Sequence, residues 1–465
     1  MAQAAPLTER KYALPFVLVT SLFFLWSIGV NLNDVLIPHL KKAFDLTDFQ
    51  SSFIQVAFFG GYFLAAFPAG RLMEKIGYKK GILLGLLICA MGTLLFLPAA
   101  SSRTYGFFLA ALFVMSSGQS FLEVGANPYV TVLGPAESSE RRLNLAQSFN
   151  AVGAALVPML GAAFILSGIE YLPAQRAAMS PAQLQAYVAS ETNLVKVPYL
   201  AITGIFLFVA ALIYFAHLPE VQESGSGVTE GESAKITGDV LAYPHLVKGV
   251  VAQFFYVGAQ VGVGSFAIRF AKQVMPQTLN AMSAWGTNFV AGQHGTLNFL
   301  THVMPTTPEK MAAFFLVAHQ TGFMIGRFAG SWMMKSISAP RLLATFGCGA
   351  LVCVLAGIGL SGLTSVLAIV VVGFFNSIMF PTIFALSIKN LGALTKRGSS
   401  LLVMSIIGGA LIPAAMGRIS DASNIRVALV VPLICYLYVI YFAINGYKPN
   451  ATLPIPQPVA AAEAK

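Results

Sequence analysis

The chain has 465 residues, of which 57% are hydrophobic and 10% are charged, and its mean hydropathy is +0.75. This composition excludes a water-soluble globular protein and predicts a helical protein that crosses a membrane many times. The net charge of +10 is better explained by basic residues that orient the chain in the membrane than by binding to nucleic acid.

Long apolar segments repeat along the chain, and each can cross about 30 Å of hydrocarbon as an α-helix. The first is too long to be a cleavable signal sequence, and no small-residue cleavage site follows it. We predict twelve spans, at residues 12–40, 51–72, 79–99, 105–133, 143–167, 196–217, 246–274, 311–333, 341–360, 364–388, 399–419 and 427–446.

The spans are expected to form two bundles of six helices. Residues 218–244 are polar and rich in Gly, Ser and Glu, so we predict a cytoplasmic linker between an N-terminal bundle, 1–217, and a C-terminal bundle, 245–465. Lysine and arginine are more frequent in the predicted inner segments, which places both termini in the cytoplasm.

A short pattern at the end of span 2 recurs at the end of span 8, which favours an internal repeat and a transporter with a cavity between its halves. At a constant offset, Gly70, Met73 and Lys75 match Gly330, Met333 and Lys335.

Two carboxylates fall within predicted spans. Asp34 follows the uncharged run 13–30 in span 1, and Glu123 lies in span 4. A buried acid in lipid is costly and usually has a function, such as loading and releasing a proton. The alternative for Asp34 is a structural role, in which it bonds to backbone groups freed by local unwinding. We predict that both acids couple transport to proton movement.

Amide side chains share faces with these acids. In span 4, Gln119, Glu123 and Asn127 are spaced by four residues and therefore lie on one face. In span 5, Gln147 and Asn150 are three residues apart. Such amides serve either as hydrogen-bonding contacts between helices or as the lining of a polar cavity.

The second half offers a comparable set in spans 7 and 10, namely Gln253, Tyr256, Gln260 and Asn376. Uncharged donors and acceptors suit a neutral polyhydroxyl ligand, and a sugar also needs an aromatic ring against its C–H face. Trp26, two turns before Asp34, is a candidate for that ring, the alternative being simple packing.

Several motifs resemble those of the major facilitator superfamily, and within it the L-fucose–proton symporter and glucose/galactose permease family. They cover nearly the whole membrane portion, at residues 31–34 (NLND), 70–80, 122–134 (LEVGANPYVTVLG), 144–150 (NLAQSFN), 256–260 (YVGAQ), 381–384 (PTIF) and 388–392.

The resemblance implies an all-α membrane protein with twelve transmembrane helices in two pseudo-symmetric bundles, the major facilitator fold. It implies proton-coupled uptake of a neutral monosaccharide by alternating access, with Asp34 as proton carrier and Glu123 linking sugar binding to protonation. The residues it suggests as sugar contacts are Trp26, Asn31, Gln147, Asn150, Gln253, Tyr256, Gln260 and Asn376.

Two departures from the fucose symporter leave the sugar open between L-fucose-like and glucose/galactose-like. Gly264 and Ser265 stand where that symporter has a bulky aromatic residue followed by Ser, and residues 376–380 are more similar to the glucose/galactose permeases.

The same fold would allow sodium in place of the proton, and a non-transporting sugar sensor is a more distant alternative. We expect no enzyme activity, cofactor, metal site or nucleic-acid partner, because no nucleophile–base set, metal-ligand spacing or phosphate-binding loop is present in the sequence. The expected partners are a small neutral sugar and the lipid bilayer. The expected location is the inner membrane of a bacterium, as a monomer.

Overall fold

The computed structural model describes residues 6–165, 175, 178–216, 218, 240–291 and 307–450. Within these ranges the side chains of a few residues, Asp34 among them, are not described. All regular secondary structure of the described residues is helical. They form two compact units, and the first takes its residues from Met1–Leu246, Ser387–Ile407 and Pro449–Lys465.

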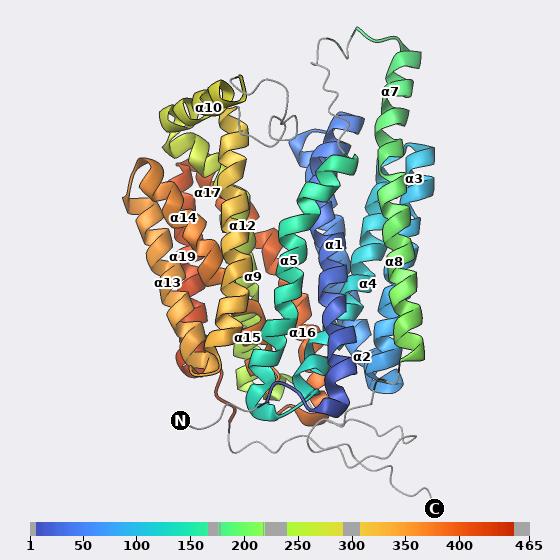
Figure 1. Ribbon diagram of the computed structural model, residues 1–465, viewed down its shortest axis with the longest axis vertical. Coiled ribbons are helices and arrows are strands. Elements are labelled where there is room, and N and C mark those ends of the chain that lie inside the picture. The colour runs from blue at the N-terminus through green and yellow to red at the C-terminus, as the bar shows by residue number, and fades with distance from the viewer. Residues whose placement is uncertain are drawn as a thin grey trace, which may run out of the picture. The chain divides into compact units, whose positions relative to one another are not determined.

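The long helices of the first unit agree with predicted spans 1 to 6 to within a few residues, whereas one further helix, Pro181–Leu194, lies between predicted spans 5 and 6 and was not predicted. Figure 1 shows them as long ribbons, of which α1 packs on α4 and α5, and α2 on α4 and α8. They are η1 (Arg10–Tyr12), α1 (Ala13–Phe44), α2 (Asp48–Leu94), α3 (Phe96–Ser102), α4 (Tyr105–Val132), η2 (Ala136–Ser138), α5 (Ser139–Ile165), α7 (Pro181–Leu194) and α8 (Lys196–Phe215).

The chain then continues through η3 (Val240–Ala242) into helices that match predicted spans 7 to 12, and into one further helix, α10, that lies between predicted spans 7 and 8 and was not predicted. They are α9 (Pro244–Val274), α10 (Pro276–Ala291), α12 (Pro308–Met333), α13 (Ala339–Gly359), α14 (Gly362–Asn376), α15 (Met379–Ser387), η4 (Gly392–Leu394), α16 (Thr395–Met404), η5 (Ser405–Ile407), α17 (Gly408–Ala422), α18 (Ile425–Ala428), α19 (Val430–Tyr441) and the π-helical turn η6 (Phe442–Gly446).

Nine helical stretches of the described residues are long and apolar enough to cross a membrane. One of them combines predicted spans 2 and 3, because α2 runs through both. The two parts are separated at Gly77, whose φ of 79° and ψ of 173° suit a residue without a side chain. The predicted linker lies largely outside the described residues, and the predicted domain boundaries stay a prediction.

Small residues allow the helices of the first unit to pack closely. A Cβ atom added to Gly85 of α2 would lie 3.0 Å from the carbonyl oxygen of Gly118 of α4, and one added to Gly118 would lie 2.7 Å from that of Gly85. In lipid there is little hydrophobic driving force between helices, so close backbone contact of this kind is a main source of association.

The segment Ser387–Ile407 packs on the first unit, where α16 contacts α2 and α4. Gly70 permits this approach, since a Cβ there would lie 2.8 Å from the Cβ of Ser400. Glu74 of α2 binds Arg397 of α16 through two contacts, 2.6 Å to Nε and 2.9 Å to Nη2. This ion pair holds α16 against the middle of α2, three residues before Gly77.

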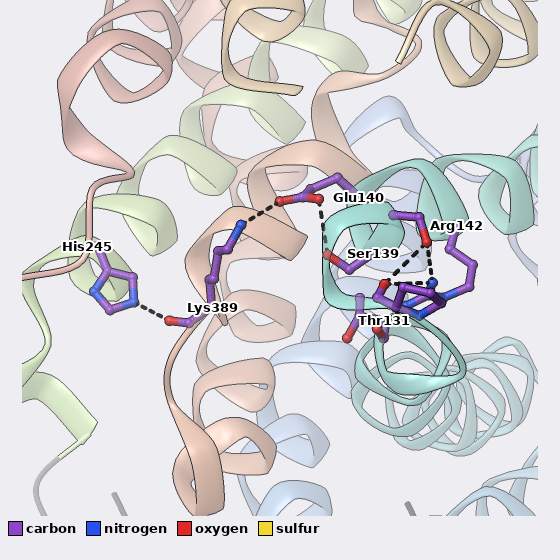
Figure 2. A network of polar contacts seen from close by, with 8 residues as sticks. Thr131, Ser139, Glu140, Arg142, His245 and Lys389 are labelled. Carbon is purple, nitrogen blue, oxygen red and sulfur yellow. Dashed lines mark hydrogen bonds and ion pairs between the residues drawn. The ribbon is translucent and has the colours of Figure 1, made fainter. Parts of the chain in front are cut away.

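Arg142 organises the connection between α4 and α5. Its side chain is fully buried, and it donates from Nε to the carbonyl of Val130 (2.8 Å), from Nη1 to Leu7 (2.9 Å) and Ser138 Oγ (2.8 Å), and from Nη2 to Thr131. Figure 2 shows the guanidinium beside Thr131 at the end of α4. Burial lowers the pKa of Arg142 to about 10, so it remains charged at neutral pH and complements the negative end of the helix.

Replacing Arg142 with Met should lower the free energy of unfolding by about 3 kcal/mol or more, because several buried carbonyls lose their donor at once. Arg142→Lys should recover only part of this, since one ammonium cannot match the fork of the guanidinium. Arg141→Met, at the next, half-buried position, removes the same charge and serves as control. Thermal unfolding in detergent measures the effect, and equal losses in both Met variants would contradict this role.

Candidate functional site

The predicted polar face of α4 is buried and contacted by neighbouring helices. Glu123 is 7% exposed, and its Oε1 accepts a hydrogen bond of 3.3 Å from the hydroxyl of Tyr62 on α2. The same hydroxyl lies 3.4 Å from Oε1 of Gln119, whose Nε2 donates to the carbonyl of Trp26 on α1 (3.4 Å). The acid and the amide one turn away are therefore linked by a tyrosine that the sequence analysis did not identify.

The amides of α5 contact this face and α1. Gln147 is buried and donates from Nε2 to Oδ1 of Asn127 (2.9 Å), and Asn127 donates in turn to the carbonyl of Glu123 (3.0 Å). Asn150 is partly exposed and donates to the carbonyl of Phe23 on α1 (3.2 Å). Gln147 of α5 therefore contacts the polar face of α4 through the side chain of Asn127.

The predicted residues of α1 lie along the same helix. Trp26 is 1% exposed, with its ring centroid 4.3 Å from that of Phe23. Asn31 is buried and donates to the carbonyl of Ser27 (2.7 Å) in its own helix. The backbone of Asp34 belongs to α1, but its side chain is outside the described residues. The roles of Trp26, Asn31 and Asp34 stay predictions.

In the second unit, Val247–Leu386 and Gly408–Lys448, two of the predicted residues meet at a break in the helix of span 10. Between α14 and α15 the helix is interrupted after Asn376. Tyr256 of α9 donates to the Asn376 carbonyl (2.9 Å), and Tyr436 of α19 donates to Oδ1 of the same residue (2.8 Å). Broken helices of this kind occur in transporters where freed backbone groups line a binding cavity.

Two amides retain unused hydrogen-bonding capacity. Gln253 is fully buried, and neither its Oε1 nor its Nε2 has a hydrogen-bond partner among the described residues. The Nδ2 of Asn376 likewise has no hydrogen-bond partner in the described part of the chain. Gln260 lies on the same face of α9 as Gln253 and is partly exposed. Buried amides without partners are costly, so these groups are suited to a polar ligand or water.

Arg327 of α12 is a second buried residue that the sequence analysis did not assign to this region. It is 4% exposed and donates from Nε to the carbonyl of Ser377 (3.0 Å), with its guanidinium 4.7 Å from the ring of Phe323. Four residues after Ser377 comes Pro381, which has no N–H to bond that carbonyl. Arg327 therefore supplies the donor that the proline removes.

A further polar network joins Ser387–Ile407 to the rest of the first unit. Lys389 pairs with Glu140 at 3.2 Å, Glu140 accepts from Ser139 Oγ (3.0 Å), and His245 Nε2 donates to the Lys389 carbonyl (2.8 Å) (Figure 2). Lys396 lies over the ring of Tyr78 at 4.6 Å. These contacts surround the connection into α16.

Residues 19–413 match the family described as Major Facilitator Superfamily. The chain belongs to the major facilitator superfamily. It is similar to a glucose/galactose transporter of Brucella abortus, with 37% identity over 441 residues that cover 95% of this chain and 96% of the relative. It is also similar to the L-fucose-proton symporter of Escherichia coli, with 39% identity over 438 residues, 94% of this chain and 93% of the relative.

A crystal structure of the Escherichia coli fucose–proton symporter has a TM-score of 0.79 against this major facilitator chain, with 37% identity over 93% of this chain and 98% of the other. The twelve-helix fold predicted from the sequence is therefore confirmed. This superfamily member is a multi-pass membrane transporter and not an enzyme.

A double-mutant cycle tests whether Arg327 replaces the hydrogen-bond donor that Pro381 lacks. Arg327→Met should lower the free energy of unfolding by about 1–3 kcal/mol, because the buried Ser377 carbonyl loses its donor. In a Pro381→Ala background the backbone N–H restored by the alanine can replace that donor, so the same change should be milder by about 1 kcal/mol. Thermal unfolding of the four proteins gives the coupling, and strictly additive losses would contradict this account.

Proposed function

We propose that this transporter is a proton-coupled symporter that takes up a neutral monosaccharide by alternating access. The single observation that carries the proposal is the polar face of α4, where the buried carboxylate of Glu123 accepts a hydrogen bond from Tyr62 and the same hydroxyl lies beside Gln119. An acid at this depth among amides gives a site that can bind hydroxyl groups and respond to a proton.

The names of the relatives support the substrate class. The relatives at 37% and 39% identity are a glucose/galactose transporter and an L-fucose-proton symporter, and both match nearly the whole chain. The two identities are close, so both an L-fucose-like and a glucose/galactose-like substrate fit this comparison.

The described polar side chains of both units are suited to bind an uncharged ligand. Gln147 and Asn150 of the first unit and Gln253 and Asn376 of the second present amides, which donate and accept hydrogen bonds without a net charge. The buried amide of Gln253 gains most from a ligand hydroxyl, because no described residue bonds it. Trp26, Asn31, Tyr256 and Gln260 complete the proposed sugar contacts.

Proton coupling is assigned to Asp34 and Glu123. In the proposed cycle Asp34 takes a proton from the outside, and Glu123 links sugar binding to that protonation. Release of the sugar to the cytoplasm is followed by release of the proton from Asp34. No cofactor is involved. The relatives come from bacteria, which supports the inner membrane as location. We propose a monomer with both termini in the cytoplasm.

Asp34→Asn should abolish sugar accumulation driven by an acid-outside pH gradient in sodium-free proteoliposomes, because Asn cannot exchange a proton. Counterflow of labelled sugar should persist, since it needs no net proton movement. Asp421→Asn, at an exposed carboxylate of α17, is the matched control and should accumulate sugar normally. Accumulation by the Asp34 variant, or accumulation driven only by a sodium gradient, would overturn the coupling assignment.

Gln253→Leu should raise the free energy of unfolding of the sugar-free protein by about 1 kcal/mol, because it removes a buried amide without partners at similar volume. The same variant should lose most of its counterflow activity. Gln260→Leu changes a partly exposed amide and should bring no such gain in stability. Thermal unfolding without sugar and counterflow are the measurements. A Gln253→Leu variant that is less stable and transports normally would show that this amide does not bind sugar.

A further inference from the structure

The helix α10 lies outside the predicted spans and takes no part in the proposed transport site. It has 16 residues, so it is about 24 Å long, too short to cross about 30 Å of hydrocarbon. It follows α9 directly, since Leu279 N donates to the carbonyl of Met275 (3.0 Å) at the junction. Figure 1 shows α10 lying across the end of the unit at which α12 begins, and the two helices pack together.

Charged residues mark where the hydrocarbon ends on the two neighbouring helices. In α9 the residues between Lys248 and Arg269 are uncharged, and this run of about 20 residues spans about 30 Å. Arg269 is exposed, with its guanidinium 4.3 Å from the ring centroid of Phe266, as expected of a basic side chain that extends towards the headgroups. In α12 the uncharged run begins after Lys310.

These boundaries place α10 at the level of the lipid headgroups. Pro276, the first residue of α10, comes seven residues after Arg269, about 10 Å further along the helix. The headgroup regions make a bilayer about 10–15 Å thicker than its hydrocarbon core. A helix with its side chains is about 10–12 Å in diameter, so side chains of α10 reach the edge of the hydrocarbon.

One flank of α10 exposes two aromatic rings. Leu279, Ser283 and Gly286 are buried and share the face that packs on the unit. Beside this face lie Trp285 and Phe289, which are 63% and 37% exposed. Their rings are stacked, with centroids 5.7 Å apart. We call these two residues the aromatic flank.

The opposite flank is polar but carries no charge. Gln277, Asn280 and Asn288 are exposed there, and we call them the amide flank. In the sequence no Asp, Glu, Lys or Arg occurs between Lys272 and Glu309. A helix surrounded by water is ordinarily rich in charged residues, whereas exposed aromatic residues gathered on one side mark contact with another apolar body.

Lipid is the partner that fits the aromatic flank. Tryptophan is enriched at membrane surfaces, because its ring is apolar while its N–H can bond to water or headgroups. The lipid-facing surface of the unit begins at the same level of α12. After Lys310, the first large apolar residues that are exposed are Phe314 and Val317, at 56% and 52%. The aromatic flank therefore continues a surface that already contacts lipid.

We propose that α10 is an interfacial helix, which lies along the membrane surface with Trp285 and Phe289 inserted between the lipid headgroups. The amide flank faces water. The helix thereby anchors the junction of α9 and α10 to the lipid. This inference does not depend on which sugar or ion is transported.

Fluorescence quenching of the full-length protein in lipid nanodiscs tests the position of Trp285. The chain has three tryptophans, and Trp332→Phe removes the other exposed one while the buried Trp26 stays. The emission that is lost when Trp285→Phe is added to this background belongs to Trp285. Lipids brominated near the headgroup end of their acyl chains should quench most of it, and lipids brominated at the chain end should quench it less. The remaining Trp26 emission should respond to neither lipid.

A tryptophan on the amide flank is the matched control. Asn280→Trp, in a protein that carries Trp285→Phe and Trp332→Phe, places the same fluorophore at an exposed position of the same helix. Acrylamide dissolved in the water should quench this tryptophan strongly and Trp285 weakly, while brominated lipids should do the reverse. Each change alters an exposed side chain, and thermal unfolding in the same nanodiscs checks that every variant is folded.

Two results would exclude the proposed contact with lipid. If acrylamide quenches Trp285 and brominated lipids do not, the aromatic flank faces water. If neither quencher affects Trp285, another part of the protein or a second copy of the chain covers that flank. Equal quenching of the tryptophans at positions 280 and 285 by brominated lipids would contradict the proposed orientation of the helix.

Discussion

Backbone carbonyls at helix ends and breaks need hydrogen-bond donors, and within a bilayer water cannot supply them. Basic side chains meet this need repeatedly in the described residues. Arg142 covers the end of α4, Lys79 donates to the carbonyls of Tyr214 and Ala216 at the end of α8 (2.9 and 2.8 Å), and Arg426 donates to Ile358 near the end of α13 (2.6 Å). Each places a positive charge at the negative end of a helix dipole, which is favourable in itself.

The same requirement shapes the candidate site. Where span 10 is broken, Tyr256 and Arg327 bond the carbonyls of Asn376 and Ser377, so the backbone there is largely satisfied by the protein. The side-chain Nδ2 of Asn376 and both amide atoms of Gln253 then have no hydrogen-bond partner among the described residues. In the first unit Glu123, Asn127 and Gln147 are already bonded to one another or to neighbours.

The sequence predicted the spans well because each apolar run is long and bounded by charged or turn-forming residues, and the break at Gly77 falls between two of them. Regular spacing also placed Gln119, Glu123 and Asn127 on one face of α4, and all three side chains are buried in the structure. The sequence did not reveal Tyr62, Tyr436 or Arg327. Each lies within an apolar stretch of its helix, and its partners depend on how the helices are rotated and packed. The basic residues were assigned only to membrane orientation, since sequence cannot show which carbonyls they reach.

The N-terminal segment is held by the same connection that Arg142 organises. Leu7 offers its carbonyl to the guanidinium, Thr8 Oγ1 donates to the Leu133 carbonyl (2.6 Å), and Ser138 Oγ donates to that of Pro6 (2.9 Å). Gly134, with φ of 157°, leaves room there for both the arginine and residues 7 and 8. An expression vector that trims these first residues, or fuses a bulky affinity tag directly before Pro6, would disturb the turn between α4 and α5.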